Sequence, residues 1–285
     1  MKRSYFKYIA ALLLFGSNGL MASHIHLTSY EIVLLRTLLG SLLLTSVFIL
    51  TKQRPACFKH KKDLLFISIS GVAMGASWMF LYEAYAQMGV SISSLLYYCG
   101  PILVMVLAPL LFKEKLTSFK VIGFIIVLCG VFLINGNIFE SHRNLFGIFC
   151  SGMSAIMYAV MVLANKKSTH ITGLENPVLQ LIISFFTVAI FVVLKNGFTF
   201  HIQGNDWVWI LILGFFNTGL GCYFYFSSIG TLPVQAVAIW GYLEPLSAVL
   251  FSVLLLSERM SVLQISGAVL ILGGAMFAEY RTAPK

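Results

Sequence analysis

Residues 240–261 read WGYLEPLSAVLFSVLLLSERMS, an apolar run that contains a glutamate and a proline near its start. The same plan occurs 144 residues earlier, where residues 97–117 read YYCGPILVMVLAPLLFKEKLT. At this constant displacement four identities coincide without a gap: Pro101 with Pro245, Glu114 with Glu258, Gly123 with Gly267, and Gly130 with Gly274. An internal repeat explains this register better than chance does. The sequence therefore predicts two copies of one unit, residues 1–143 and 144–285, which together form one domain.

The composition excludes a soluble domain. Of the 285 residues, 59% are hydrophobic and 10% are charged, whereas soluble domains carry about 25% charged residues. The net charge of +9 lies in short loops between apolar segments. We therefore expect a lipid bilayer rather than nucleic acid as the partner. The five cysteines form no CxxC pair, so neither a disulfide framework nor a metal site is expected, and no cofactor motif is present.

The chain contains enough apolar segments for ten transmembrane helices, each of which needs about 20 mainly apolar residues. Residues 1–22 also resemble a signal peptide, but the displacement places 5–22 on 149–166, so we expect the first helix to be retained. The ten segments are 5–22, 29–51, 64–88, 90–112, 117–135, 145–166, 174–195, 206–228, 234–256 and 261–280.

Each predicted unit has five helices, and the displacement also places Glu31 on Glu175 and Gly75 on Gly219. Because five is odd, consecutive copies enter the membrane from opposite sides. This is the inverted-repeat plan of many secondary transporters.

The distribution of Lys and Arg predicts the orientation. With a cytoplasmic N-terminus, the inner helix ends carry 15 of the 19 basic residues, the outer ends carry three, and Arg36 lies within a helix. The positive-inside rule therefore places both termini in the cytoplasm. The three outer residues are Arg143, Lys195 and Arg259.

The ends of the two units resemble a known family. They read P-ILVMVLAPLLFK-E-K-L-T followed by VIGFIIVLCGVFLI, and P-LSAVLFSVLLLS-E-R-M-S followed by ISGAVLILGGAMF. This pattern is similar to the EamA-type branch of the drug/metabolite transporter superfamily, over residues 5–280. The resemblance implies ten helices in two inverted halves and movement of small metabolites, amino acids among them, often outward. The family often has Trp-Gly in its first helix, where this chain has Phe15-Gly16.

Glu244 is the sharpest candidate for a functional residue. It lies ten residues into the segment that starts at 234, hence about 15 Å along it and near the middle of a hydrocarbon core about 30 Å thick. Ionisable groups at this depth are candidates for function. Desolvation favours the protonated carboxyl, which suits a proton carrier or a ligand for a substrate amine. Alternatively, Glu244 satisfies polar groups near Pro245, which frees the carbonyl of Gly241.

Gly100-Pro101 and Gly241 with Pro245 are candidate hinges, because they interrupt corresponding helices of the two units. Broken helices at matching positions indicate a transporter site. Two tolerated kinks are the alternative.

Aromatic and polar residues at similar depth predict the wall of a cavity for a small molecule. The alternative for each of them is a role in packing or at the membrane interface. They are Trp78, Tyr82, Tyr97, Tyr98, Tyr158, Asn217, Tyr223, Trp240 and Tyr242.

Three further polar residues are weaker candidates. Asn18 either bonds a neighbouring helix or faces the cavity. Arg36 needs a partner, which could be a substrate carboxylate, Glu31 or another structural group. Glu83 faces a vestibule or reaches the membrane interface.

Enzyme motifs are absent from the sequence. All six histidines lie in loops or at helix ends, and neither HExxH, GxSxG nor a GxxxxGK[ST] phosphate loop occurs. We therefore expect an all-α inner-membrane secondary transporter, driven by a solute gradient or by protons. Its expected substrate is an amino acid or a related compound, moved outward. Uptake or exchange of a cationic amine is the alternative, and an intramembrane enzyme is a more distant one.

Overall fold

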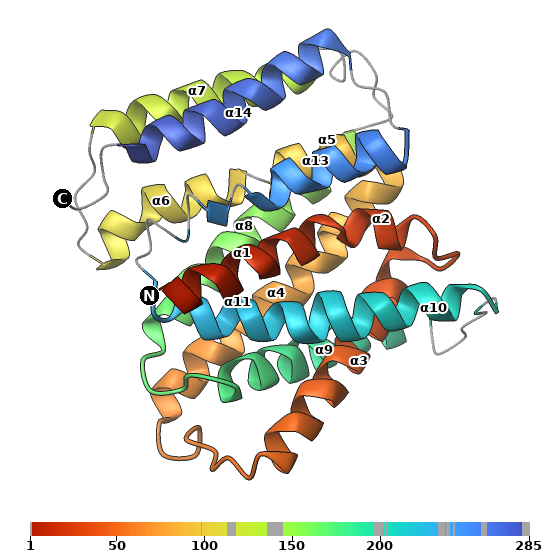
Figure 1. Ribbon diagram of the computed structural model, residues 1–285, viewed down its shortest axis with the longest axis vertical. Helices are drawn as coiled ribbons and strands as arrows, with labels where there is room; N and C mark the ends of the chain where they lie inside the picture. The colour runs from red at the N-terminus through yellow and green to blue at the C-terminus, as the bar shows by residue number, and fades with distance from the viewer. Residues whose placement is uncertain are drawn as a thin grey trace.

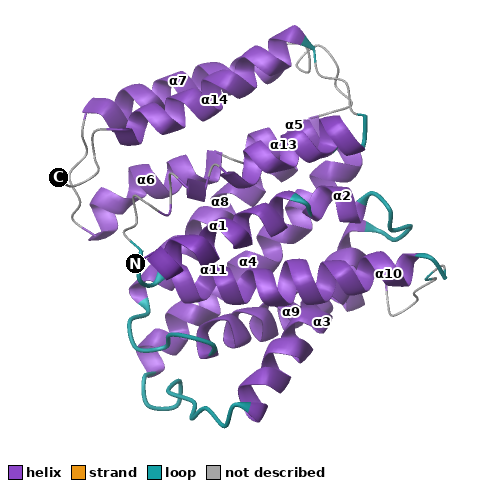
Figure 2. Cartoon of the chain, viewed as in Figure 1, coloured by secondary structure: helices purple, strands orange, loops and turns teal. Residues whose placement is uncertain are grey.

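The computed structural model describes residues 2–280, except 98, 113–117, 136–144, 197–201, 203, 233–236, 238–239, 242 and 258–260. Throughout these ranges the chain forms helices joined by loops, without a strand (Figure 2). The all-helical prediction is therefore confirmed for the described residues.

The helices lie close to the ranges that the apolar segments predicted (Figure 1). The first half contains α1 (Lys2–Gly16), α2 (Asn18–Ala22), α3 (Ser29–Leu50), α4 (Lys61–Met88), α5 (Val90–Tyr97), α6 (Cys99–Phe112) and α7 (Ser118–Asn135). The second half contains α8 (Leu145–Lys167), α9 (Glu175–Asn196), α10 (Asp206–Leu211), the π-helix η2 (Ile212–Leu220), α11 (Gly221–Ile229), α13 (Leu243–Leu255) and α14 (Val262–Tyr280).

Six described helical stretches are long and apolar enough to cross a membrane: Ser29–Leu50, Lys61–Met88, Ile92–Phe112, Leu145–Lys167, Glu175–Lys195 and Asp206–Ile229. Helices α1 with α2, α7, α13 and α14 lie where four more spans were expected. The count of ten spans stays a prediction.

The two halves of the chain interleave in the bundle. Helix α4 packs against α8 and α9, α3 packs against α9 and η2, and α1 packs against α11 and α13. Helix α1 begins at the end of the bundle where helix α14 ends (Figure 1). We call this the amino-terminal end.

Helices α7 and α14 pack mainly on each other and form a separate layer beside the other helices (Figure 1). A Cβ atom on Gly130 would lie 2.6 Å from the carbonyl oxygen of Gly267, and one on Gly274 would lie 3.0 Å from that of Gly123. Small residues allow such close backbone approach between membrane helices. The repeated glycines of the sequence therefore have a packing role.

Glu31 and Glu175 occupy corresponding positions in the two halves, 144 residues apart, and both accept hydrogen bonds from backbone N–H groups. Glu31 accepts a hydrogen bond from Thr28 N at 2.7 Å and completes a capping box at the start of α3. Glu175, at the start of α9, accepts from Ala56 N at 2.9 Å and from Cys57 N at 2.8 Å. Burial raises the pKa of the Cys57 thiol, and the adjacent Glu175 carboxylate raises that pKa further.

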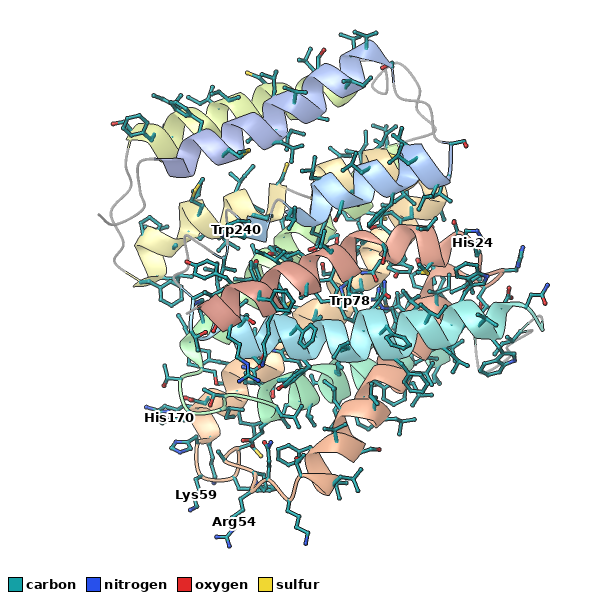
Figure 3. The ribbon with its side chains drawn as sticks, viewed as in Figure 1. His24, Arg54, Lys59, Trp78, His170 and Trp240 are labelled. Atoms are coloured by element: carbon teal, nitrogen blue, oxygen red, sulfur yellow. The ribbon has the colours of Figure 1, made fainter. Side chains whose placement is uncertain are left out.

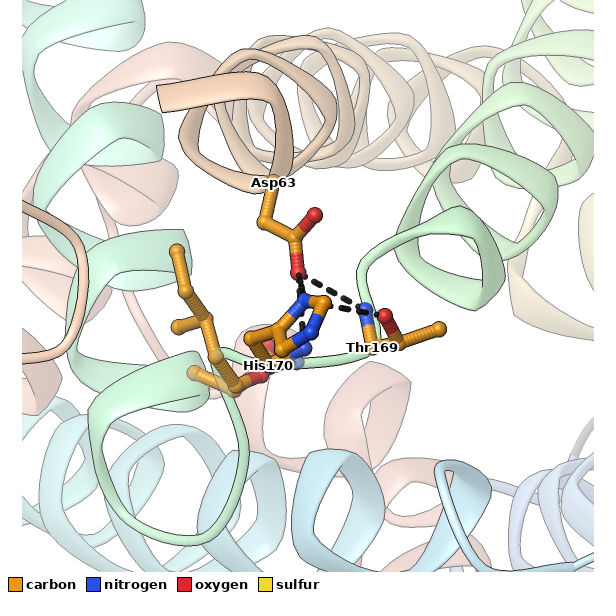
Figure 4. Close-up of polar contacts among 5 residues, drawn as sticks. Asp63, Thr169 and His170 are labelled. Atoms are coloured by element: carbon orange, nitrogen blue, oxygen red, sulfur yellow. Dashed lines mark hydrogen bonds and ion pairs between the residues drawn. The ribbon is translucent and has the colours of Figure 1, made fainter. Parts of the chain in front are cut away.

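Two His–Asp contacts join the halves of the chain. Asp63, at the start of α4, accepts from Thr169 N at 2.9 Å and lies 3.0 Å from His170 Nδ1 (Figure 4). Asp206, at the start of α10, lies 2.9 Å from His26 Nδ1. Figure 3 shows His170 and His24, a neighbour of His26, at opposite ends of the bundle. Among the described residues, His–Asp contacts between the halves thus occur at both ends of the bundle.

Candidate functional site

A cavity inside the bundle is lined by side chains from both halves of the chain. The space between its lining atoms is narrow, with room for about one water molecule. The helices therefore pack closely around this cavity. Its lining residues are Phe15, Asn18, Met74, Trp78, Leu81, Tyr82, Tyr97, Tyr158, Met161, Cys222, Tyr225, Phe226 and Glu244.

Glu244 supplies the carboxylate of this cavity from the first turn of α13. The residue is 9% exposed, and no described residue pairs with its carboxylate. A buried carboxylate without a partner is a strong acceptor for a cation or a proton. The structure therefore places the sharpest sequence candidate on the cavity wall.

Aromatic rings packed on one another form the cavity wall toward the amino-terminal end. Tyr97 and Tyr158 meet edge to face with ring centroids 5.4 Å apart, and the hydroxyls of Tyr158 and Tyr225 lie 3.2 Å apart. Tyr8 packs on Tyr225 at 5.4 Å and donates a hydrogen bond to the carbonyl of Val237 at 2.7 Å. These contacts close the cavity on that side.

Arg36, on α3, lies against the cavity wall and is 1% exposed. Its guanidinium carbon lies 4.2 Å from the ring centroid of Trp78. Its Nη1 donates to the hydroxyl of Tyr82, and its Nε donates to Thr218 Oγ1 at 2.8 Å. Its Nη2 is buried and has no hydrogen-bond partner. Glu31, one of the predicted partners of Arg36, instead caps α3.

The π-helix η2 positions the acceptor for Arg36 Nε. Within it, the Thr218 hydroxyl donates to the carbonyl of Leu213 at 2.7 Å, so its oxygen lone pairs face outward to accept from Arg36. Wide helical turns of this kind are frequent at functional sites. The sequence analysis did not predict this π-helix.

Asn217, also in η2, ties this helix to the junction of α1 and α2. Its Nδ2 lies 2.8 Å from the carbonyl oxygen of Leu14, 2.9 Å from Ser17 Oγ and 3.1 Å from Asn18 Oδ1. Asn217 is therefore a helix-bridging residue and does not line the cavity. Asn18 meets both expectations, because it bonds a neighbouring helix and also lines the cavity.

Three predicted site residues lie away from the cavity. Tyr223 lies under Lys7, whose Nζ is 4.7 Å from the ring centroid. Trp240 is 41% exposed and packs edge to face on Tyr5. Glu83 accepts a hydrogen bond from Gln87 Nε2 at 2.9 Å. Two others, Tyr98 and Tyr242, lie outside the described residues, as do the turn glutamates Glu114 and Glu258.

The candidate hinge segments of the two halves meet beside the cavity. A Cβ atom on Gly241 would lie 4.0 Å from Pro101 Cγ and 3.9 Å from the Tyr158 hydroxyl. One on Gly100 would lie 2.8 Å from Cδ1 of Tyr158. Pro101 and Pro245 are each the third residue of a described segment, α6 and α13 respectively. Whether the segments move stays a prediction.

Several cavity residues were not predicted. Tyr225 satisfies the same depth criterion as Tyr223, but depth does not show which face of α11 turns inward. The others carried no sequence signal, because apolar side chains line the cavity, the core and the lipid-facing surface alike. They are Phe15, Met74, Leu81, Met161, Cys222 and Phe226.

A second hollow, of about 580 Å³, lies at the end of the bundle opposite the amino-terminal end. Its walls come from α2, the following loop, and the adjacent ends of α3, α4 and α5. Tyr82 lines both this hollow and the central cavity. Tyr82 therefore stands between the two spaces.

Comparison with known proteins decides the family. The model of the EamA-like transporter family matches residues 2–136 and again residues 145–280. The chain belongs to the EamA-like transporter family. The resemblance in the repeated P…E segments is thereby confirmed, and this EamA-like chain is a multi-pass membrane protein of a transporter family.

Relatives of this EamA-like protein include transporters from bacteria and archaea. An uncharacterized transporter, YxxF, from Bacillus subtilis (strain 168) is 27% identical over 282 residues, which cover 98% of this chain and 90% of the relative. An uncharacterized transporter from Archaeoglobus fulgidus is 24% identical over 252 residues, 87% of each chain. One solved crystal structure shares the fold, with a TM-score of 0.74 and 16% identity over 99% of both chains.

Proposed function

We propose that this EamA-like protein is a secondary transporter that moves a small metabolite, an amino acid or a related compound, across the inner membrane. The observation that carries the proposal is the narrow cavity inside the bundle, in which the one carboxylate among the described lining residues, Glu244, is accompanied by aromatic rings. Ligand sites in proteins are typically concave and mostly apolar, with few polar groups.

Alternating access through two inverted units is the proposed mechanism. The double match of the family model supports two units, and the cavity takes side chains from both. Contacts between distant segments close the amino-terminal end: Tyr8 with Val237, Lys166 Nζ with the Leu232 carbonyl at 2.7 Å, and Thr231 with Ser4. The hollow beyond Tyr82 lies at the other end. If the contacts at the amino-terminal end broke and the hollow beyond Tyr82 closed, the cavity would open to the opposite side of the membrane.

Charge supports the proposed orientation and the proposed driving force. The bias of Lys and Arg supports cytoplasmic termini, so the closed amino-terminal end is the cytoplasmic side in this proposal. Glu244 is the proposed proton site, because its unpaired carboxylate can take up either a proton or a cationic group. Outward movement is then coupled to the solute gradient or to protons.

Transport by the purified protein in liposomes tests this function. Wild type is expected to exchange at least one labelled metabolite from an amino-acid and amine panel faster than protein-free liposomes, with a rate that depends on pH. Glu244→Gln is expected to lose the pH dependence, whereas Glu83→Gln, at a carboxylate outside the cavity, retains it. Exchange no faster than in empty liposomes for any solute would contradict the transporter proposal. An unchanged pH profile in Glu244→Gln would remove Glu244 from proton coupling.

The acidic, aromatic cavity also favours a second candidate, uptake or exchange of a cationic amine. An exporter lowers the internal level of its substrate in cells that overproduce it, whereas an uptake system raises that level. Labelled amine and amino acid given to such cells distinguish the two.

A further inference from the structure

The guanidinium of Arg36 is incompletely paired in the middle of the bundle. Trp78 covers one of its faces, Thr218 occupies Nε and Tyr82 occupies Nη1, while Nη2 is buried without a partner. Buried donors are nearly always paired, so an exception calls for a missing acceptor. The acceptor must approach along the plane of the guanidinium, because the N–H bonds of this planar group lie in that plane.

The position of the free nitrogen specifies the chemistry of that acceptor. A guanidinium presents two forked edges, Nη1 with Nη2 and Nε with Nη2, and each edge matches the two oxygens of a carboxylate. Nη2 belongs to both edges. The Tyr82 hydroxyl at Nη1 is a neutral acceptor that a carboxylate would outcompete. Tyr82 also faces the hollow at the far end, so its displacement would open a path to Arg36.

The opposite charge, Glu244, lines the cavity against whose wall Arg36 lies. Trp78 and Tyr82, which contact Arg36, line this cavity together with Glu244, and no ion pair joins the two described residues Arg36 and Glu244. Aromatic and apolar side chains line the rest of this cavity, among them Met74, Met161 and Phe226. A positive and a negative group held apart by apolar wall are complementary to a zwitterion that has an apolar side chain.

We propose that Arg36 and Glu244 are the two poles of the substrate site and that the substrate is a zwitterionic amino acid with an apolar side chain. Its carboxylate takes the Nη1–Nη2 edge of Arg36 in place of the Tyr82 hydroxyl, and its ammonium group binds the Glu244 carboxylate. The inference rests on the proposed transport function and narrows its substrate class. An amine without a carboxylate, or a carboxylate without an amine, leaves one pole unpaired and is rejected for that reason.

Competition during exchange in liposomes tests the two poles separately. The probes are labelled L-phenylalanine, L-leucine and L-methionine, and the competitors are phenylalaninamide, which lacks the carboxylate, and 3-phenylpropanoate, which lacks the amine. In wild type each competitor is expected to be weaker than unlabelled phenylalanine by at least about tenfold, the order expected when a buried charge loses its partner. Arg36→Gln is expected to abolish the preference for phenylalanine over phenylalaninamide, and Arg36→Lys to restore it in part.

A second variant does not remove the buried arginine. Tyr82→Phe deletes the hydroxyl that competes for Nη1, so the KM for phenylalanine is expected to fall while inhibition by phenylalaninamide is unchanged. If Arg36 were only a packing residue, Arg36→Gln and Tyr82→Phe would each change the apparent affinities for phenylalanine and for phenylalaninamide by the same factor. That result would overturn the inference. Glu83→Gln is the control for expression and reconstitution.

The outcomes also separate this inference from the transport function. Exchange of other metabolites without any of the three amino acids would overturn the zwitterion site and leave the transporter standing. Equal inhibition by phenylalaninamide and phenylalanine in wild type would likewise overturn it and favour the cationic amine. Failure of every solute in the wider panel would remove both proposals.

Discussion

Arg36 shows how a buried charge is retained within a membrane helix. Placing an arginine at the centre of such a helix costs about 2.5–3.5 kcal/mol on insertion scales. The stacked Trp78, with the guanidinium carbon 4.2 Å from its ring centroid, and the hydrogen bond to Thr218 at 2.8 Å offset part of this cost. The remaining cost is the unpaired Nη2, which the proposed substrate carboxylate would satisfy.

The contribution of Thr218 can be measured with a near-isosteric substitution. Thr218→Val removes the acceptor of Arg36 Nε and is expected to destabilise the protein by about 1–3 kcal/mol, because a buried donor loses its partner. Thr218→Ser keeps the hydroxyl and is the matched control. The measurement is the Tm of both variants in the same detergent. Equal Tm values for the two variants would show that this hydrogen bond does not stabilise the fold.

The Cys57 thiol gives a pH prediction. Its folded-state pKa is raised, by burial first and by Glu175 second, so less thiolate exists at a given alkaline pH than in an exposed cysteine. Maleimide labelling of Cys57 is therefore expected to begin at higher pH than labelling of unfolded protein. Glu175→Gln removes the negative charge and should shift the labelling profile of the folded protein to lower pH. Mass spectrometry of labelled peptides gives the profile, and no shift would exclude the influence of Glu175.

At the scale of the elements, Gly100 makes a close helix contact beside the cavity. A Cβ atom there would meet Tyr158 Cδ1 at 2.8 Å and the carbonyl oxygen of Ala155 at 3.2 Å, whereas the nearest atom to a Cβ on Gly241 would be 3.6 Å away. A ring and a backbone carbonyl cannot easily move aside. Helices α6 and α8 are therefore held together by the absence of a side chain at Gly100.

Alanine substitutions at the two candidate hinge glycines should differ accordingly. Gly100→Ala is expected to destabilise the protein by about 1–3 kcal/mol through overpacking, while Gly241→Ala is expected to be close to neutral. Tm values of the two variants in detergent provide the comparison. A Gly100→Ala variant as stable as Gly241→Ala would mean that α6 and α8 can separate freely.

The elements were predictable because length and hydropathy determine them. The segments predicted at 29–51 and 174–195 are observed as Ser29–Leu50 and Glu175–Asn196. Depth along a helix also selected Trp78, Tyr82, Tyr97, Tyr158 and Glu244, which line one cavity in the structure. Depth does not determine the rotation of a helix, and apolar residues occur on every face of a membrane helix. For this reason Tyr223 and Trp240 were assigned to the cavity and Tyr225 was missed.

The π-helix was unpredictable for a different reason. Residues 212–220 read ILGFFNTGL and are as apolar as an ordinary helix. Their wide turns are visible only in the backbone hydrogen bonds, such as that from the Gly221 N–H to the carbonyl of Phe216, five residues earlier. The interaction of Arg36 with Thr218 depends on this local geometry. For this reason the sequence could not show which of several possible partners Arg36 binds.

For the whole molecule, the closure of the amino-terminal end has a direct test. Thr231 Oγ1 donates to Ser4 Oγ at 3.0 Å, a separation from which a disulfide can form with little movement. In a background without the five native cysteines, Ser4→Cys with Thr231→Cys is expected to stop exchange when oxidised, and a reductant should restore it. The physical reason is that the cross-link holds shut the end that alternating access must open.

The controls for this cross-link are the two single cysteine variants under the same oxidant. Full exchange activity in a quantitatively cross-linked sample would mean that this end of the bundle does not need to open. The orientation of that end in the membrane stays a separate question, which reporter fusions at the two termini would answer.

The layer formed by α7 and α14 has a consequence for biosynthesis. Helix α7 ends at Asn135, whereas its glycine-matched partner α14 begins at Val262, nearly the whole second half of the chain later. During synthesis α7 therefore enters the membrane long before the surface that fits Gly123 and Gly130 exists. In that interval its glycine face lacks the helix that fits it. Ribosome stalling after α13 should accordingly leave α7 open to chaperone capture and to degradation, even though every described residue of the cavity wall has already been made.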